Sequence, residues 1–152
     1  MNTLHKELLT IVRENSNGFF KDGFSYVGTT RPYYDISVPT LSKILKTFLR
    51  NHTTMTQEEY EKLLTSLYHG ESFTERTIPG YLLHDCPPLR KKLNPQILDE
   101  WLSQLWGWCE IDSTCQSSFT AEEMLSNWST WKKLPDFCRF LGLGVKFPFT
   151  TV

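Results

Sequence analysis

Apolar residues recur at spacings of three and four along most of the chain, a pattern that predicts a succession of amphipathic helices. The first stripe predicts a helix over residues 3–14, and its apolar positions are Leu4, Leu8, Ile11 and Val12. Glycines and aromatic residues then alternate over residues 18–35, which indicates an irregular segment packed onto something else. A second helix follows from Pro39, because proline is well tolerated in a first turn.

Three segments carry the capping-box pattern, with a hydroxyl residue followed by glutamate three positions later. They are Thr56–Glu59, Ser72–Glu75 and Thr120–Glu123. The first predicts a helix through Tyr68 and the second a helix that ends near Cys86. Gly80 lies inside the second helix, where glycine costs about 1 kcal/mol relative to alanine. We therefore expect a neighbouring backbone to approach closely at Gly80.

All five tryptophans lie in residues 101–131, and Asn94-Pro95 begins the first helix that contains them. If this helix continues without a break, one face carries Leu98, Trp101, Leu105, Trp108 and Asp112. An unpaired buried carboxylate is costly, so Asp112 must cap a helix, form a pair or take part in chemistry. We expect Trp101, Trp128 and Trp131 to lie in the core, and Trp106 to pack elsewhere on the helix.

These helices, their short connections and the lack of a convincing alternating strand predict an all-α fold. Antiparallel helical hairpins stacked side by side, as a solenoid or a compact bundle, satisfy the pattern. We expect a single domain over residues 1–152, with an atypical tail over 142–152. The end of a short solenoid is left uncovered, so either this tail shields it or the chain forms a homodimer through its C-terminal end.

Composition narrows the functional classes. The 152 residues are 39% hydrophobic and 22% charged with a net charge of −1, so any nucleic-acid binding needs cations gathered on one face. Four cysteines without CxxC or Cys/His spacing predict reduced thiols in a cytoplasmic protein and no metal site. The N-terminus is not a secretory signal, and no apolar run is long enough for a membrane span.

Several segments resemble the DNA alkylation repair family of HEAT-like helical repeats, whose members are glycosylases for N3- and N7-alkylated purines. The residues that carry the resemblance are Ser25–Thr30, Tyr34–Leu41, Leu67–Phe73 and Trp108–Asp112. The last is the most specific, a tryptophan and an aspartate four residues apart. Asp35 stands where the family usually has glycine. The resemblance covers roughly residues 25–135 and implies a HEAT-like superhelix, double-stranded DNA with alkylated bases as partner, and no cofactor.

The resemblance implies that Asp112 is the catalytic carboxylate and that Trp108 assists it. From periodicity alone, Asp112 as the N-cap of a short helix is the simpler interpretation. Tyr26, Arg31 and Lys43 are candidate DNA contacts, and Arg90-Lys91-Lys92 is a short basic run in a loop. A solvated surface position is the more common outcome for any single Lys or Arg, and for a short charged run in a loop.

Family members are commonly longer and carry a further arginine and tryptophan on their DNA-binding face. Neither is recognisable in residues 132–152. Three functions therefore stay open: an alkylpurine DNA glycosylase, a non-catalytic helical-repeat module that binds DNA or protein, and a shortened relative with neither activity. In a bacterial cell the first would associate with the nucleoid.

Overall fold

The computed structural model describes residues 2–23, 26, 28–115, 120–126 and 128–133, and these residues are predominantly helical. The tail over 142–152 and the predicted dimer contact at the C-terminal end lie outside this range. Within the described part of the chain, no helix has the length and apolar character needed to cross a membrane.

The helices follow one another with brief connections. Their bounds are α1 Thr3–Glu14, α2 Val38–Asn51, α3 Gln57–Tyr68, α4 Phe73–Asp85, α5 Pro87–Arg90, α6 Gln96–Leu102, α7 Trp108–Cys115, α8 Ala121–Ser126 and α9 Trp128–Trp131. Two short antiparallel strands, β1 Phe19–Phe20 and β2 Tyr33–Tyr34, pair between α1 and α2 with Phe19 opposite Tyr34.

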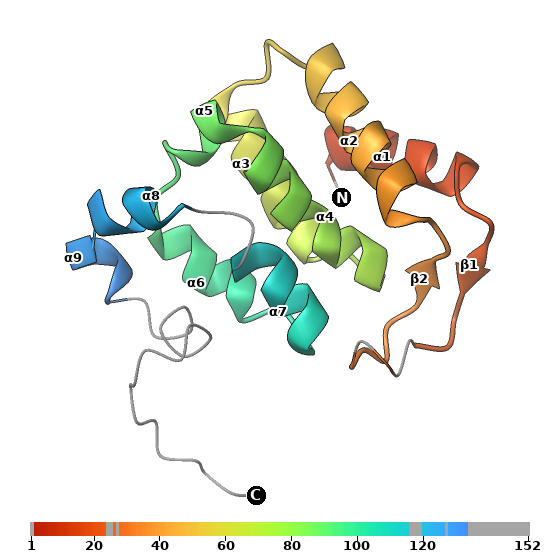
Figure 1. Ribbon diagram of the computed structural model, residues 1–152. Helices are drawn as coiled ribbons and strands as arrows, with labels where there is room; N and C mark the ends of the chain where they lie inside the picture. Colours follow the sequence, from red (N-terminus) through yellow and green to blue (C-terminus); the bar gives the residue numbers. More distant parts are fainter. Residues whose placement is uncertain (1, 24–25, 27, 116–119, 127, 134–152) are drawn as a thin grey trace, which may run out of the picture.

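Successive helices form two layers. Helix α4 packs between α2 and α7 in one layer, while α1 packs against α3 in the other. Figure 1 shows α6 continuing the second layer and the small hairpin of β1 and β2 beside α2 and α4. Paired helices stacked in two layers are the arrangement of a HEAT-like helical fold, which confirms the predicted fold class.

Local sequence signals fix the helix starts. The predicted capping boxes of α3, α4 and α8 are all present: each hydroxyl accepts from the amide of the glutamate, and each glutamate accepts from the amide of the capping residue. Ser37 caps α2 by accepting from the Thr40 amide, with Pro39 in the first turn as expected. These bonds satisfy amides that a helix start otherwise leaves unpaired.

The tryptophans divide between core and surface. Trp101 is fully buried, stacks on Tyr68 with 5.0 Å between ring centroids, and donates from Nε1 to Thr65 Oγ1 at 2.9 Å. This confirms its predicted core position. The predictions for Trp106 and Trp128 were wrong, because these side chains are 65% and 38% exposed. The side chain of Trp131 lies outside the described residues.

The predicted continuous tryptophan helix is also wrong. Helix α6 ends at Leu102 and α7 begins at Trp108, so Trp101 and Asp112 do not share a helix face. Gly107 has a φ of 80°, a conformation that glycine adopts without steric cost. The preceding amide, that of Trp106, donates to the Glu110 side chain at 2.8 Å instead of continuing a helix.

A buried polar cluster joins α1, α3 and α4. The His5 ring contacts Ser66 Oγ at 2.8 Å through Nδ1 and Glu75 Oε1 at 3.0 Å through Nε2. Burial raises the pKa of Glu75, but hydrogen bonds from His5 and Ser72 outweigh it and leave the pKa below its ordinary value. The capping glutamate of α4 therefore also connects the two layers.

Candidate functional site

Trp108 and Asp112 lie one turn apart on the outward face of α7. Trp108 is 52% exposed and Asp112 is partly exposed, whereas Glu110 and Thr114 face the interior. Residues four apart in a helix lie above one another, so the indole and the carboxylate share this face. The structure thus brings together the two residues predicted for catalysis.

Asp112 is the fifth residue of α7, so it does not cap a helix that begins after it. Among the described residues, no side chain or amide forms an ion pair or hydrogen bond with its carboxylate. Its negative charge adds to burial in raising the pKa of the Cys109 and Cys115 thiols, the latter to about 12. Both thiols are therefore protonated, weak nucleophiles at neutral pH.

A small groove of about 340 Å³ lies where α2, α4 and α7 meet, and Ser113, the residue after Asp112, contributes to its wall. It is lined by Ser42, Lys46, Gly80, Tyr81, His84, Asp85 and Ser113. Burial and the nearby Cys109 raise the pKa of Tyr81, so its phenol keeps its proton and can donate a hydrogen bond. The groove therefore offers the ammonium group of Lys46 and the hydroxyl groups of Ser42, Tyr81 and Ser113 next to α7.

A buried carboxylate anchors the segment before α7. Glu110 has no exposed surface; its Oε2 accepts from the Trp106 amide at 2.8 Å and its Oε1 from Arg31 Nε at 3.1 Å. Thr29 Oγ1 also donates to Oε1, at 3.4 Å. Burial raises the pKa of Glu110 despite these donors. Glu110 thereby links the loop before β2 to the turn between α6 and α7.

The same loop brings Tyr26 to Trp108. Their rings meet edge to face with 6.4 Å between centroids, and Tyr26 is 79% exposed. Gly28 has a φ of 71° and lies close to the indole, since a Cβ there would be 3.5 Å from Trp108 Cδ1. Tyr26, one of the predicted DNA contacts, is thus an immediate neighbour of Trp108.

The other predicted cationic contacts lie elsewhere. Arg31 is engaged by Glu110, and its Nη2 also donates to the Gln104 carbonyl at 3.3 Å. Lys43 is exposed in a depression between α1 and α2, on a different side of α2 from the groove that Lys46 lines. The prediction of a solvated loop for Arg90 was wrong, because Arg90 is buried and pairs with Glu123 at 2.8 Å.

The sequence analysis missed Glu110 and Lys46. A glutamate between Trp108 and Asp112 has no sequence signal for burial, because Thr29 and Arg31, its two side-chain partners, lie about 80 residues earlier in the chain. Lys46 could have been selected, since the apolar stripe of α2 leaves it exposed, but nothing in the sequence shows which exposed lysine faces α7.

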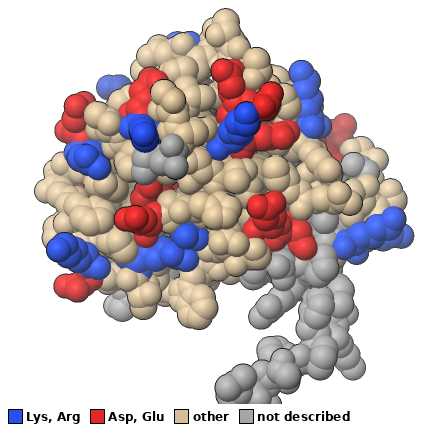
Figure 2. Space-filling view, turned by 180° about the vertical axis from the view of Figure 1, so that it is seen from behind, with Lys and Arg blue, Asp and Glu red and all other residues tan. Residues whose placement is uncertain are grey.

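The opposite side of the molecule carries mixed charge. Figure 2 shows Lys and Arg side chains interspersed with Asp and Glu across the face seen from behind. This face offers no continuous cationic surface to a polyanion. In the part of the chain that the structure describes, no group of three or more His, Cys, Asp or Glu side chains could hold a metal ion.

A family model described as DNA alkylation repair enzyme matches residues 6–137, which is most of the chain. The chain therefore belongs to the DNA alkylation repair enzyme family, and DNA repair is the role that this membership supports. No curated protein and no solved structure shows a significant match.

Proposed function

We propose that the chain hydrolyses the N-glycosidic bond of N3- or N7-alkylated purines in double-stranded DNA. In this reaction the bond between C1′ and the base breaks, and its electron pair neutralises the cationic alkylated base, which leaves as the free purine. Water then adds to C1′ and loses a proton, so the products are a free base and an abasic sugar. No oxidant, reductant or metal is needed for this balance.

Asp112 is the proposed catalytic carboxylate, and its lack of an ion-pair or hydrogen-bond partner among the described residues is the observation that carries the proposal. An alkylated purine is already a good leaving group, so no strong general acid is required. The sugar gains oxocarbenium character as the bond breaks, and a nearby carboxylate stabilises that charge and can accept the proton of the attacking water. The paired carboxylates of ordinary glycoside hydrolases are unnecessary here.

Trp108 is proposed to attract the cationic nucleotide. An indole face stabilises a cation by about 0.5–2 kcal/mol, which favours a charged, damaged base over a neutral one. Its position one turn before Asp112 would place both side chains against the same nucleotide. The indole also meets the ring of Tyr26 edge to face.

The phosphate backbone is proposed to run along the layer formed by α2, α4 and α7. Lys46 lies in the groove beside Ser113, and Tyr26 is exposed next to Trp108, so both could contact the strand that carries the lesion. Lys43 would reach a phosphate only farther along α2. Arg31 would act mainly by holding its loop, since Glu110 and Gln104 already accept from its guanidinium.

Release of free 7-methylguanine or 3-methyladenine from alkylated DNA tests the proposal. Asp112→Asn should abolish release while leaving the melting temperature and DNA affinity nearly unchanged, because the amide has the same shape and no described partner is lost. Glu122→Gln, on exposed α8, is the matched control and should release base normally. Full release by Asp112→Asn would exclude the proposed role.

A non-catalytic helical-repeat module that binds DNA or protein is the second candidate. The net charge of −1 and the pairing of Arg31 and Arg90 with carboxylates leave little free positive charge for DNA, which favours protein as the partner of such a module. Saturable binding to alkylated duplex with no release of base would support it over the glycosylase.

A further inference from the structure

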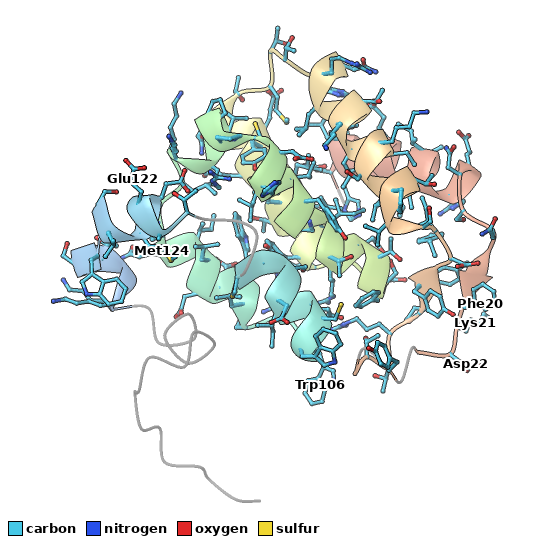
Figure 3. The ribbon with its side chains drawn as sticks, in the orientation of Figure 1. Phe20, Lys21, Asp22, Trp106, Glu122 and Met124 are labelled. Atoms are coloured by element: carbon cyan, nitrogen blue, oxygen red, sulfur yellow. The ribbon has the colours of Figure 1, made fainter. Side chains whose placement is uncertain are left out.

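The turn between α6 and α7 presents a second exposed indole that the proposed chemistry does not use. Trp106 is 65% exposed and lies two residues before Trp108, with Gly107 between them. Figure 3 shows its side chain directed away from the body of the protein, at the edge where the loop between β1 and β2 approaches α7. A single exposed apolar side chain is ordinary, whereas several exposed apolar side chains close together point to an interaction site.

The backbone beneath this indole is held firmly. The Trp106 amide donates to fully buried Glu110, and the carbonyl of Gln104 accepts from both Arg31 and Arg76. Burial and the nearby Arg31 lower the pKa of Arg76 from its ordinary value. The exposed side chain therefore stands on a turn that hydrogen bonds fix from two sides.

Trp108 and Tyr26 extend the same apolar edge. Both side chains are more than half exposed, and their rings contact each other. Trp108 lies two residues after Trp106 in the chain. An aromatic ring held on a fixed turn beside a DNA-reading site can stack on a base or insert between base pairs. Its contact would be apolar, since an indole neutralises no phosphate.

We infer that Trp106 is a further DNA-contacting residue, an aromatic wedge that packs against the bases of the nucleotides next to the lesion. Glu110 is the positioning residue that holds the wedge in place. This inference rests on the proposal that Trp108 and Asp112 face DNA. Trp106 adds affinity for the duplex around the lesion, while Asp112 acts on the lesion itself.

Equilibrium binding of the full chain to an unmodified duplex oligonucleotide, with base release from the same duplex containing 7-methylguanine, tests the inference. Trp106→Ala should weaken binding by roughly 5- to 100-fold, the range of one lost aromatic contact with a base. The slope of affinity against salt should stay unchanged, because no phosphate contact is removed. Trp106→Phe should retain part of the affinity.

Trp128→Ala is the matched control, since Trp128 is an exposed tryptophan on α9 and should leave affinity unchanged. Affinity of Trp106→Ala within about twofold of the unaltered chain, or an equal loss in Trp128→Ala, would overturn the inference. So would unchanged affinity with an altered sedimentation coefficient, which would make this edge a contact between two copies. The unaltered chain could also bind the duplex and release no base, while Trp106→Ala binds the duplex weakly. That result would support the DNA contact of Trp106 and exclude the glycosylase activity.

Discussion

Gly80 of α4 and Ser113 of α7 pack backbone against backbone. A Cβ on Gly80 would lie 2.0 Å from the Ser113 carbonyl oxygen, far inside any real contact distance. The sequence analysis predicted such an approach from a glycine inside a helix, and the structure confirms it. The close packing places Ser113, the residue after Asp112, in the wall of the groove that α4 also lines.

Gly80→Ala should therefore destabilise the protein although alanine favours a helix. The backbone of Ser113 cannot move aside as a flexible side chain could, so α4 and α7 must separate. We expect a loss of about 2 kcal/mol, the usual cost of overpacking, and a melting temperature lower by roughly 5–8 °C. Thermal unfolding followed by circular dichroism measures this, and an unchanged melting temperature would contradict the packing described.

Glu110→Ala should be among the most destabilising substitutions in the chain. It removes the acceptor for Trp106, Thr29 and Arg31 and leaves the partly buried guanidinium of Arg31 without its partner, a loss of about 3 kcal/mol. Glu110→Gln should cost less, because burial already disfavours the charged form, as the raised pKa of Glu110 indicates. Urea denaturation of both variants separates the two effects. Equal losses would show that the charge, and not the acceptor, is what matters.

Acid should destabilise the protein through Glu75. Its pKa is lowered from 4.5 in the folded state, so its contribution to stability is complete above about pH 4.5 and is lost as the pH falls through the folded value. Glu110 has the opposite sign, because its raised pKa means that the folded state binds the proton more readily. The contribution of Glu75 to the free energy of unfolding should thus be lost as the pH falls below about 4.5, and Glu110 should offset part of that loss.

Glu75→Gln should be less stable than the unaltered chain at pH 7 and should show a flatter profile between pH 5 and 3. Glu122→Gln, an exposed acid outside this cluster, should follow the unaltered chain at every pH. A steep acid transition that persists in Glu75→Gln would assign the effect to other carboxylates.

Lys46 and Lys43 should differ in their contribution to DNA binding. If the backbone runs along α2, α4 and α7, Lys46→Ala removes one phosphate contact and should reduce the salt slope by about one. Lys43→Ala, on the side of α2 that faces α1, serves as the matched substitution and should change the slope less. Affinities measured from 50 to 200 mM salt decide this, and identical slopes for both variants would contradict the proposed path.

Local signals in the sequence predicted the starts of α2, α3, α4 and α8, because a cap is made by residues three positions apart. The same reasoning failed in the segment from Leu98 to Asp112. Its apolar spacing continues through Leu105 and Trp108, yet the helix stops at Leu102. The break is caused by Gly107 and by the long-range hydrogen bonds of Glu110, and the spacing of apolar residues reveals neither.

The site was predicted in part for the same reason. Trp108 and Asp112 share a helix face even though the helix before them ends at Leu102, because their four-residue spacing lies within α7. The placement of Arg31 depends on a buried partner 79 residues away, which no local pattern reveals. Exposed Trp106 and Trp128 were predicted as packed because an aromatic residue near an apolar stripe is usually buried, and only tertiary packing shows that these two are not.

The burial of Trp101 gives the chain an internal optical reference. An indole that stacks on Tyr68 and donates to Thr65 inside the core should emit at short wavelength and resist collisional quenchers. The water-facing indoles of α7 and the turn before it should emit further to the red and be quenched readily. A ligand that covers this edge would protect the exposed indoles from the quencher and leave the emission of Trp101 unchanged. Loosening of the fold would instead alter the emission of Trp101, so intrinsic fluorescence can distinguish the two events.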